Sequence, residues 1–235
     1  MKLAIMQPYL FPYIGYFQLI QAVDKFVIYD DVQYMKGGWI NRNKILVNKN
    51  PYTFTFSVKK DSYEKNINQR YFNQNFSKER KKFLKTLKES YGKATYFNDV
   101  FPLVEKSLQI NIEEQNIAEV ISKSIKLISE YLRIDTEFIL SSNVEKKTEA
   151  REERIIELNK ILGCNHYINA IGGKDLYTKE YFADRNVKLN FIKTDSDLSY
   201  EQDNDEFVPN LSIIDVLMYN SVEETRELLN KYQLI

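Results

Sequence analysis

The chain has 235 residues, enough for one large domain or two small ones with a substantial buried core. Its 33 basic and 33 acidic residues give a formal net charge of zero, which argues against a basic nucleic-acid-binding face covering the whole surface. One cysteine and one histidine exclude an internal disulfide framework and a zinc site built from Cys and His ligands. A Mg²⁺ ion held by carboxylates stays open.

The composition also bears on location and surface. No apolar run approaches the roughly 20 residues that span a bilayer, and the N-terminus lacks the pattern of a cleaved signal. We therefore expect a cytoplasmic protein without a membrane span. The 17 tyrosines exceed what a core alone needs, so we expect some of them to line a polar cleft.

Residues 1–43 predict a strand, turn, helix and strand in that order. A short apolar strand at residues 3–6 is followed by a turn with two prolines, Pro8 and Pro12. Apolar residues then recur at helical spacing over residues 14–23, and a second apolar strand covers residues 26–29. This order predicts a βαβ unit whose two strands are parallel.

The middle of the chain is predicted to be mainly helical. A hairpin with strands at 44–47 and 52–58 comes first, and the polar residues 59–75 follow as a surface excursion. Amphipathic spacing then predicts three helices, over residues 77–91, 98–109 and 117–132.

Alternation of strands and helices returns after residue 134. Strands are expected at residues 138–140, 166–171 and 187–192, with helices at 148–162, 179–185, 212–219 and 222–232 and an acidic loop at 195–206. The predicted fold class is α/β with a Rossmann-like parallel sheet. Residues 1–75 and 134–235 would form the α/β core, and residues 76–133 a helical subdomain or insertion.

Polar residues follow the predicted strands at the point where open α/β sheets bind ligands. Gln7 ends the first strand, and its amide suits a sugar hydroxyl or a base edge. Asp30 and Asp31 end the second strand, with Gln33 close behind. One aspartate could act as a general base or bind a ribose or Mg²⁺; the alternative is that both cap loops.

Two glycine pairs add further candidates. Behind Gly37-Gly38, Trp39 could stack on a sugar or base and Arg42 could pair with phosphate, with Asn41 and Asn43 on one face. A structural salt bridge is the alternative for Arg42. At the end of the strand at 166–171, Asn169, Gly172 and Gly173 could present backbone N–H groups to phosphate, or form a plain turn.

Cys164 and His166 could form a thiol nucleophile and its base. The cysteine enters a predicted buried strand, where a thiol normally behaves as a small apolar group, so a structural role is favoured.

Three blocks resemble the WbqC-like family: IMQPYLFPYIGYFQLIQAVDKFVIYDDVQYMKGGWINRNKIL, YINAIGGKDLYTKEYF and LSIIDVLMYNS. The resemblance covers essentially the whole chain; one local departure is Ala94-Thr95-Tyr96-Phe97, where an Ala-Pro pair is expected. It implies a role among bacterial surface-polysaccharide genes, beside enzymes that make nucleotide-linked amino sugars. Attachment of an acyl or aminoacyl group to such a sugar is the implied activity. No catalytic residue of the family carries over.

The opening unit also resembles, more weakly, nucleotidylyltransferase-type proteins, whose first helix opens with His-x-Gly-His. Here Tyr13, Gly15 and Tyr16 occupy that motif, with tyrosines in place of both histidines. A neutral tyrosine carries no cationic charge for a leaving phosphate, so ordinary adenylylation is not expected. The free N–H groups at the helix start could still bind a phosphate.

The leading hypothesis is an acyl- or aminoacyltransferase acting on the amine of a nucleotide-linked amino sugar. Its donor could be acyl-CoA or an acyl carrier protein. The runner-up is an ATP-dependent amide ligase, which would use ATP and Mg²⁺. A non-catalytic partner of a sugar-modifying enzyme is a third candidate, and a glycosyltransferase with Asp30 and Asp31 as a metal-binding pair is a fourth.

Overall fold

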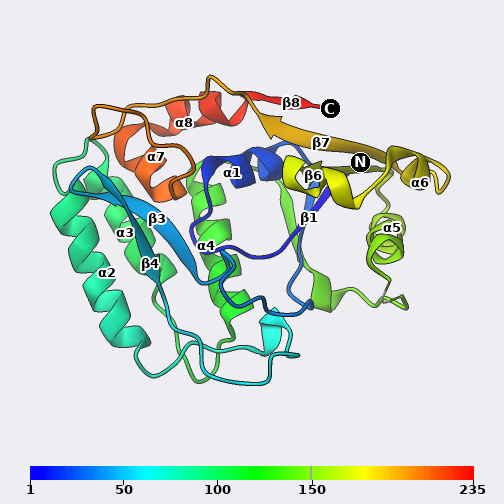
Figure 1. Cartoon of the computed structure of the whole chain (residues 1–235), viewed down its shortest axis with the longest axis horizontal. Coiled ribbons are helices and arrows are strands. Elements are labelled where there is room, and N and C mark those ends of the chain that lie inside the picture. The colour runs from blue at the N-terminus through cyan, green and yellow to red at the C-terminus, as the bar shows by residue number, and fades with distance from the viewer. Residues whose placement is uncertain (149) are drawn as a thin grey trace.

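A computed structural model of the chain describes residues 1–148 and 150–235, and a six-stranded sheet runs through it (Figure 1). In spatial order its strands are β5 (Glu137–Leu140), β2 (Lys25–Ile28), β1 (Lys2–Met6), β6 (His166–Ala170), β7 (Lys188–Thr194) and β8 (Tyr232–Leu234). All neighbours are parallel except β8, which runs antiparallel to β7. The predicted α/β class with a Rossmann-like parallel sheet is confirmed.

The strand order reverses between β1 and β6, and the sheet opens there. β1 pairs with β2 from Leu3 to Met6, but it pairs with β6 only through Lys2 and Leu3. The carboxyl halves of β1 and β6 therefore diverge and leave a crevice. Open α/β sheets bind their ligands at such a reversal.

Each face of the sheet is covered by its own core, as the alternation of strand side chains requires. Ala4 and Phe26 face the larger core, which includes helix α1 (Ile14–Gln21). Leu3 and Ile5 face a smaller core. Helices α5 (Arg151–Ile161) and α6 (Lys179–Ala183) contribute to that smaller core.

The larger core continues into the helical middle of the chain. This part contains β3 (Arg42–Val47), β4 (Asn50–Thr55), α2 (Phe76–Tyr91), α3 (Phe97–Ser107) and α4 (Ile117–Tyr131), and Figure 1 shows it on the side away from α5 and α6. Phe56, Phe83 and Ile121 are buried in the same cluster as Phe17 of α1. The division into an α/β core and a helical insertion stays a prediction.

The remaining elements close the sheet and its loops. Helices α7 (Ile213–Tyr219) and α8 (Val222–Leu229) precede β8, and short 3₁₀ turns occur at η1 (Ile67–Gln69), η2 (Ser141–Asn143) and η3 (Ile171–Leu176). No helix in the described part of the chain is long and apolar enough to cross a membrane.

Three differences from the sequence expectations have local causes. Asn48 and Lys49 have φ of 50° and 62°, a two-residue hairpin turn, so β4 begins at Asn50 and not at Tyr52. The expected final helix stops at Leu229, and β8 follows it. The helix expected from Thr148 begins at Arg151. Residue 149 lies outside the described residues.

Candidate functional site

A cavity of about 880 Å³ occupies the crevice between the carboxyl ends of β1 and β6. Its walls also include the loop after β2, the loop that carries Trp39, the 3₁₀ turn η3 and the first turn of α5. Residues proposed from the sequence that line it are Gln7, Tyr13, Asp31, Gln33, Trp39, Asn169, Gly172 and Gly173.

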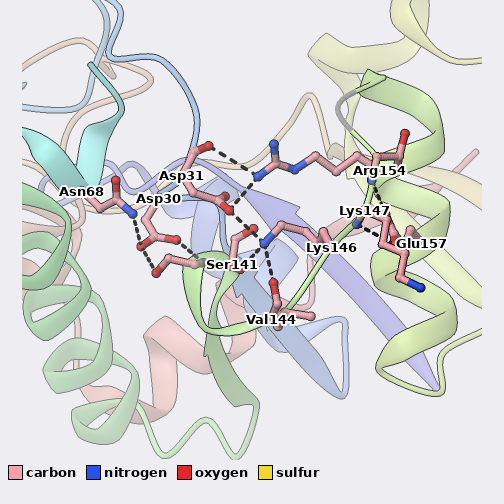
Figure 2. Close-up of polar contacts among 11 residues, drawn as sticks. Asp30, Asp31, Asn68, Ser141, Val144, Lys146, Lys147, Arg154 and Glu157 are labelled. Atoms are coloured by element: carbon pink, nitrogen blue, oxygen red, sulfur yellow. Dashed lines mark hydrogen bonds and ion pairs between the residues drawn. The ribbon is translucent and has the colours of Figure 1, made fainter. Parts of the chain in front are cut away.

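Asp31 binds two cations at the cavity wall. Its Oδ2 lies 2.8 Å from Lys146 Nζ and 2.6 Å from an Nη of Arg154 (Figure 2). Burial raises the pKa of this carboxyl, but the hydrogen bond from Lys146 and the charge of Arg154 outweigh burial and hold the pKa below its usual value. Asp31 is therefore ionised at neutral pH and fixes Arg154 in place.

Asp30 serves a different set of partners. Its carboxylate is buried and accepts hydrogen bonds from the backbone N–H and the hydroxyl of Ser142, at 2.9 and 2.6 Å. The Asn68 amide donates a longer bond of 3.4 Å. Figure 2 shows the two aspartates directed toward these separate partners. Asp30 thus ties η1 and η2 to the end of β2 and does not line the cavity.

The first turn of α5 supplies two arginines that the sequence reading missed. Arg151 and Arg154 line the cavity with Ile155, at the spacing that puts three side chains on one helix face. The Arg154 guanidinium also lies 5.3 Å from the centre of the Tyr29 ring. The sequence carries no signal that singles them out, because η2 and a loop separate α5 from β5 and a basic helix face has the same pattern when it faces solvent.

The loop before α5 is tied to the helix it precedes. The Glu157 carboxylate accepts hydrogen bonds from the backbone N–H groups of Lys147 and Thr148, at 2.9 and 3.1 Å. Lys146 in turn donates to the carbonyl oxygens of Ser141 and Val144. These contacts hold the Lys146 ammonium where Asp31 can bind it (Figure 2).

Tyrosines form much of the cavity wall, as the composition predicted: Tyr9, Tyr13, Tyr29, Tyr167 and Tyr177. Burial raises the pKa of Tyr9 and of Tyr13, so both hydroxyls stay protonated and can donate hydrogen bonds.

Gly15 and Tyr16 support the residues that form this wall. A Cβ at Gly15 would stand 2.4 Å from Cε2 of Tyr13, so the glycine makes room for the Tyr13 ring. The buried Tyr16 donates its hydroxyl hydrogen bond to the Gln7 carbonyl, at 2.9 Å. Neither residue lines the cavity; both fix its first strand-end turn.

The glycine pair after β6 has two separate roles. A Cβ at Gly173 would stand 2.2 Å from the Asn169 Nδ2, so Gly173 makes room for that side chain. A Cβ at Gly172 would meet nothing within 4 Å. Asn169 Oδ1 accepts the Ala170 N–H at 2.9 Å, which aims the amide toward the cavity edge.

Asn41, Arg42 and Asn43 do not line this cavity and instead secure the Trp39 loop. Asn41 donates to the Phe56 carbonyl at 2.7 Å, and Asn43 donates to the Phe11 carbonyl at 2.9 Å. The Arg42 Nε donates to the Gly38 carbonyl at 3.0 Å, and its guanidinium lies 5.3 Å from the Trp39 ring centre.

Cys164 and His166 lie at the amino end of β6, away from the cavity. His166 Nε2 is 2.9 Å from Asn190 Oδ1, and burial lowers the pKa of the imidazole. Burial raises the pKa of the Cys164 thiol, which leaves it protonated. Neither residue lines the cavity.

Comparison with known proteins identifies the family. The model of the WbqC-like protein family matches residues 7–227. The chain is similar to a protein of Mycobacterium tuberculosis described as uncharacterized protein Rv1507c, with 27% identity over 219 residues, 92% of each chain. No solved structure matches it. The chain belongs to the WbqC-like protein family.

Proposed function

We propose that the protein transfers an acyl or aminoacyl group to the amine of a nucleotide-linked amino sugar bound in the crevice cavity. Membership of the WbqC-like family suggests a role in surface-polysaccharide biosynthesis. The identities of the amino sugar, the donor and the reaction go beyond family membership and are proposed here.

The observation that supports the proposal most is the pair of arginines beside the strand-end glycine turn. Arg151 and Arg154 face the same cavity as Gly172 and Gly173. Guanidinium groups pair with phosphate oxygens through two hydrogen bonds, and glycine turns let backbone N–H groups approach them. A diphosphate suits this wall. The volume of about 880 Å³ lies within the usual range for ligand pockets.

The opposite wall suits the sugar and the base. Tyr9, Tyr13 and Trp39 offer aromatic faces and Gln7 offers an amide group, while the Asn169 amide lies beside Gly173. Aromatic faces stack on sugar rings and bases, and amides both donate to and accept from hydroxyls. The ligand would therefore lie with its phosphates toward α5 and its sugar toward the Trp39 loop.

Acyl transfer needs a neutral amine near the acyl carbon and donors for the oxygen that gains charge. The protonated hydroxyls of Tyr9 and Tyr13 are suitable donors. Asp31 is the only carboxylate that lines the cavity within residues 1–148 and 150–235. A carboxylate with a lowered pKa is a weak base, which weighs against Asp31 as the group that removes the amine proton.

The experiment supplies a uridine-diphosphate-linked sugar with a free amine, together with a panel of activated acyl and aminoacyl donors. We expect the sugar nucleotide to gain the mass of one acyl group. Arg151→Ala should raise KM for the sugar nucleotide about tenfold, whereas Lys160→Ala, an exposed change on the same helix, should not. Asp31→Asn tests proton removal; an unchanged kcat removes the residue from that role.

The ATP-dependent amide ligase is the second candidate, because Tyr13 stands in the cavity at the start of α1, where the nucleotidylyltransferase motif has its first histidine. It predicts that product forms only with ATP and that AMP is released. Binding of the sugar nucleotide without turnover under any of these conditions favours the non-catalytic partner. Absence of both binding and turnover contradicts the proposal.

A further inference from the structure

A second, smaller pocket of about 330 Å³ adjoins the crevice cavity. Its lining residues are Tyr9, Pro12, Tyr13, Trp39, Asn43, Lys44 and Asn210. Tyr9, Tyr13 and Trp39 also line the crevice cavity, so these three aromatic side chains form the wall that the two spaces share.

The smaller pocket is held in shape by bonds between distant parts of the chain. Phe11 has a left-handed φ of 44°, and its carbonyl accepts hydrogen bonds from Asn43 at 2.9 Å and from the Ser212 hydroxyl at 2.7 Å. The Ser212 N–H donates to the Lys44 carbonyl at 2.8 Å. The aromatic turn, β3 and the segment before α7 are therefore locked together around the pocket.

Lys44 is the charged residue in the lining of the smaller pocket within the described chain, and its charge is positive. The Lys44 ammonium lies 5.5 Å from the centre of the Trp39 ring, and the Arg42 guanidinium lies 5.3 Å from the same ring. Among the described residues, no aspartate or glutamate lines this pocket. A ligand that carried an ammonium group would meet Lys44 across a short, partly desolvated distance, where like charges repel most strongly.

We propose that the smaller pocket binds the acyl group of the donor and accepts only acyl groups without a positive charge. This inference rests on the proposed function and sharpens it, because it selects acyl transfer over aminoacyl transfer. The aromatic lining suits a short carbon chain, and Lys44 suits a neutral group or one with a carboxylate.

A sugar nucleotide in the crevice cavity and an acyl group in the smaller pocket would meet at the shared aromatic wall, where acyl transfer takes place in one step. The amine of the sugar nucleotide attacks the acyl carbon, a C–N bond forms, and the bond from the acyl carbon to the leaving atom of the activated donor breaks. The proton that the amine loses departs with the leaving group. The hydroxyls of Tyr9 and Tyr13, on the wall between the two spaces, can donate to the acyl oxygen.

The single tryptophan of the chain makes the test direct. Trp39 is the sole Trp and lines both spaces, so its fluorescence reports binding in either. The probes are the propionyl, malonyl and glycyl thioesters of N-acetylcysteamine, which have acyl groups of similar size and different charge. The propionyl and malonyl probes should bind, and the glycyl probe should bind about tenfold more weakly.

Charge reversal at the pocket should reverse this order. Lys44→Glu should strengthen glycyl binding and weaken malonyl binding, each about tenfold. Lys36→Glu is the matched control, because Lys36 is exposed on the neighbouring loop and lines neither space. Lys44→Met gives a second variant that should lose the malonyl preference without adding a charge, should Lys44→Glu fold poorly.

The same acyl groups on sulfamoyl adenosine, a stable substitute for an acyl adenylate, form a second set of probes. Charge selection in either set supports the pocket, and the set that binds more tightly identifies the donor type. The inference is overturned if the wild type binds glycyl and propionyl probes equally. It is also overturned if Lys36→Glu changes the binding of the probes as much as Lys44→Glu does.

Uridine diphosphate separates this inference from the proposed function. Its binding should survive Lys44→Glu and be weakened about tenfold in Arg151→Ala. If the acyl probes show the predicted charge selection while no amino sugar is ever acylated, the pocket stands and the proposed reaction fails.

Discussion

Asp31 and Asp215 are both held by several partners, but the partners differ in charge. Asp31, with 16% of its side chain exposed, binds the cations of Lys146 and Arg154 at the crevice cavity. Asp215 is fully buried, and its carboxylate accepts hydrogen bonds from three neutral groups in the described part of the chain: Tyr91 at 2.7 Å, Tyr200 at 2.9 Å and Gln202 at 3.1 Å. Among the described residues it lines neither the cavity nor the smaller pocket.

The difference indicates what each carboxylate does. Tyr91 lies on α2 and also accepts the Leu46 N–H of β3, so Asp215 joins α2, β3 and the acidic segment at residues 195–206 to α7. Asp31 instead holds an arginine whose helix neighbour, Arg151, faces the same cavity. A carboxylate among neutral donors fixes the fold, and we propose that the carboxylate among cations arranges charge for a ligand.

Removal of Asp215 should have the largest effect on stability. Asp215→Ala leaves the donors of Tyr91, Tyr200 and Gln202 buried without an acceptor, which should lower the free energy of unfolding by about 3 kcal/mol or more. Urea denaturation measures this. Asp205→Ala, in the same acidic segment but exposed, is the control and should change little. A loss no larger than the control would remove Asp215 from its structural role.

Removal of Asp31 should cost less, because water reaches part of the site. Asp31→Ala leaves Lys146 and Arg154 without their shared carboxylate, and we expect a loss of about 2 kcal/mol after the discount for partial exposure. The same denaturation experiment applies. Asp61→Ala, which breaks a surface pair with Lys65, serves as the control.

The two carboxylates should respond to pH with opposite signs. The pKa of Asp31 lies below 3.8 in the folded protein, so its stabilising contribution is present above that value and is lost as pH falls through the lower pKa. Burial raises the pKa of Asp215 above 3.8, so the folded state binds its proton more tightly, and stability falls as pH rises from 3.8 through the raised value.

Unfolding measured between pH 3 and pH 7 should therefore separate the conservative variants. The stability advantage of the wild type over Asp31→Asn should shrink on acidification, whereas its advantage over Asp215→Asn should grow. Parallel curves for the two variants would show that the two sites titrate alike, contrary to the difference in charge between their partners.

The smallest expected effect is the stabilisation of the protein by a ligand, which should depend on the crevice cavity and not on Asp215. Uridine diphosphate at ten times its Kd should stabilise the wild type by about 1.4 kcal/mol, seen as a higher Tm. Asp215→Asn should keep this increment, since Asp215 does not line the cavity, and Arg151→Ala should lose most of it. If the stabilisation by uridine diphosphate were lost in Asp215→Asn and kept in Arg151→Ala, the nucleotide would bind near Asp215 and not in the crevice cavity.

The sheet could be predicted because its strands carry their own signal. Apolar runs such as those at residues 3–6 and 26–29 mark buried parallel strands wherever they fall. β8 has no such run: Tyr232–Leu234 is short and largely exposed, and only its pairing with β7 defines it. An edge strand of this kind depends on a neighbour that the local sequence does not reveal.

The candidate site divides in the same way. Gln7, Asp31 and Asn169 could be predicted because each lies at or just after the carboxyl end of a strand at the crevice. Arg151 and Arg154 could not, because a charged helix face looks the same in sequence whether it meets solvent or a cavity. Asn41 and Asn43 show the converse, since a polar side chain in a loop gives no sign that its hydrogen bonds are already made within the protein.

The proposed function depends on the binding of a nucleotide-linked amino sugar in the crevice cavity, with α5 holding its phosphates. A crystal structure of the protein with a uridine-diphosphate-linked amino sugar tests this binding mode. We expect the diphosphate between Arg151, Arg154 and the Gly172–Gly173 turn, with the amine toward Tyr9, Tyr13 and Trp39. A ligand bound elsewhere, or one whose phosphates lie away from both arginines, would contradict it.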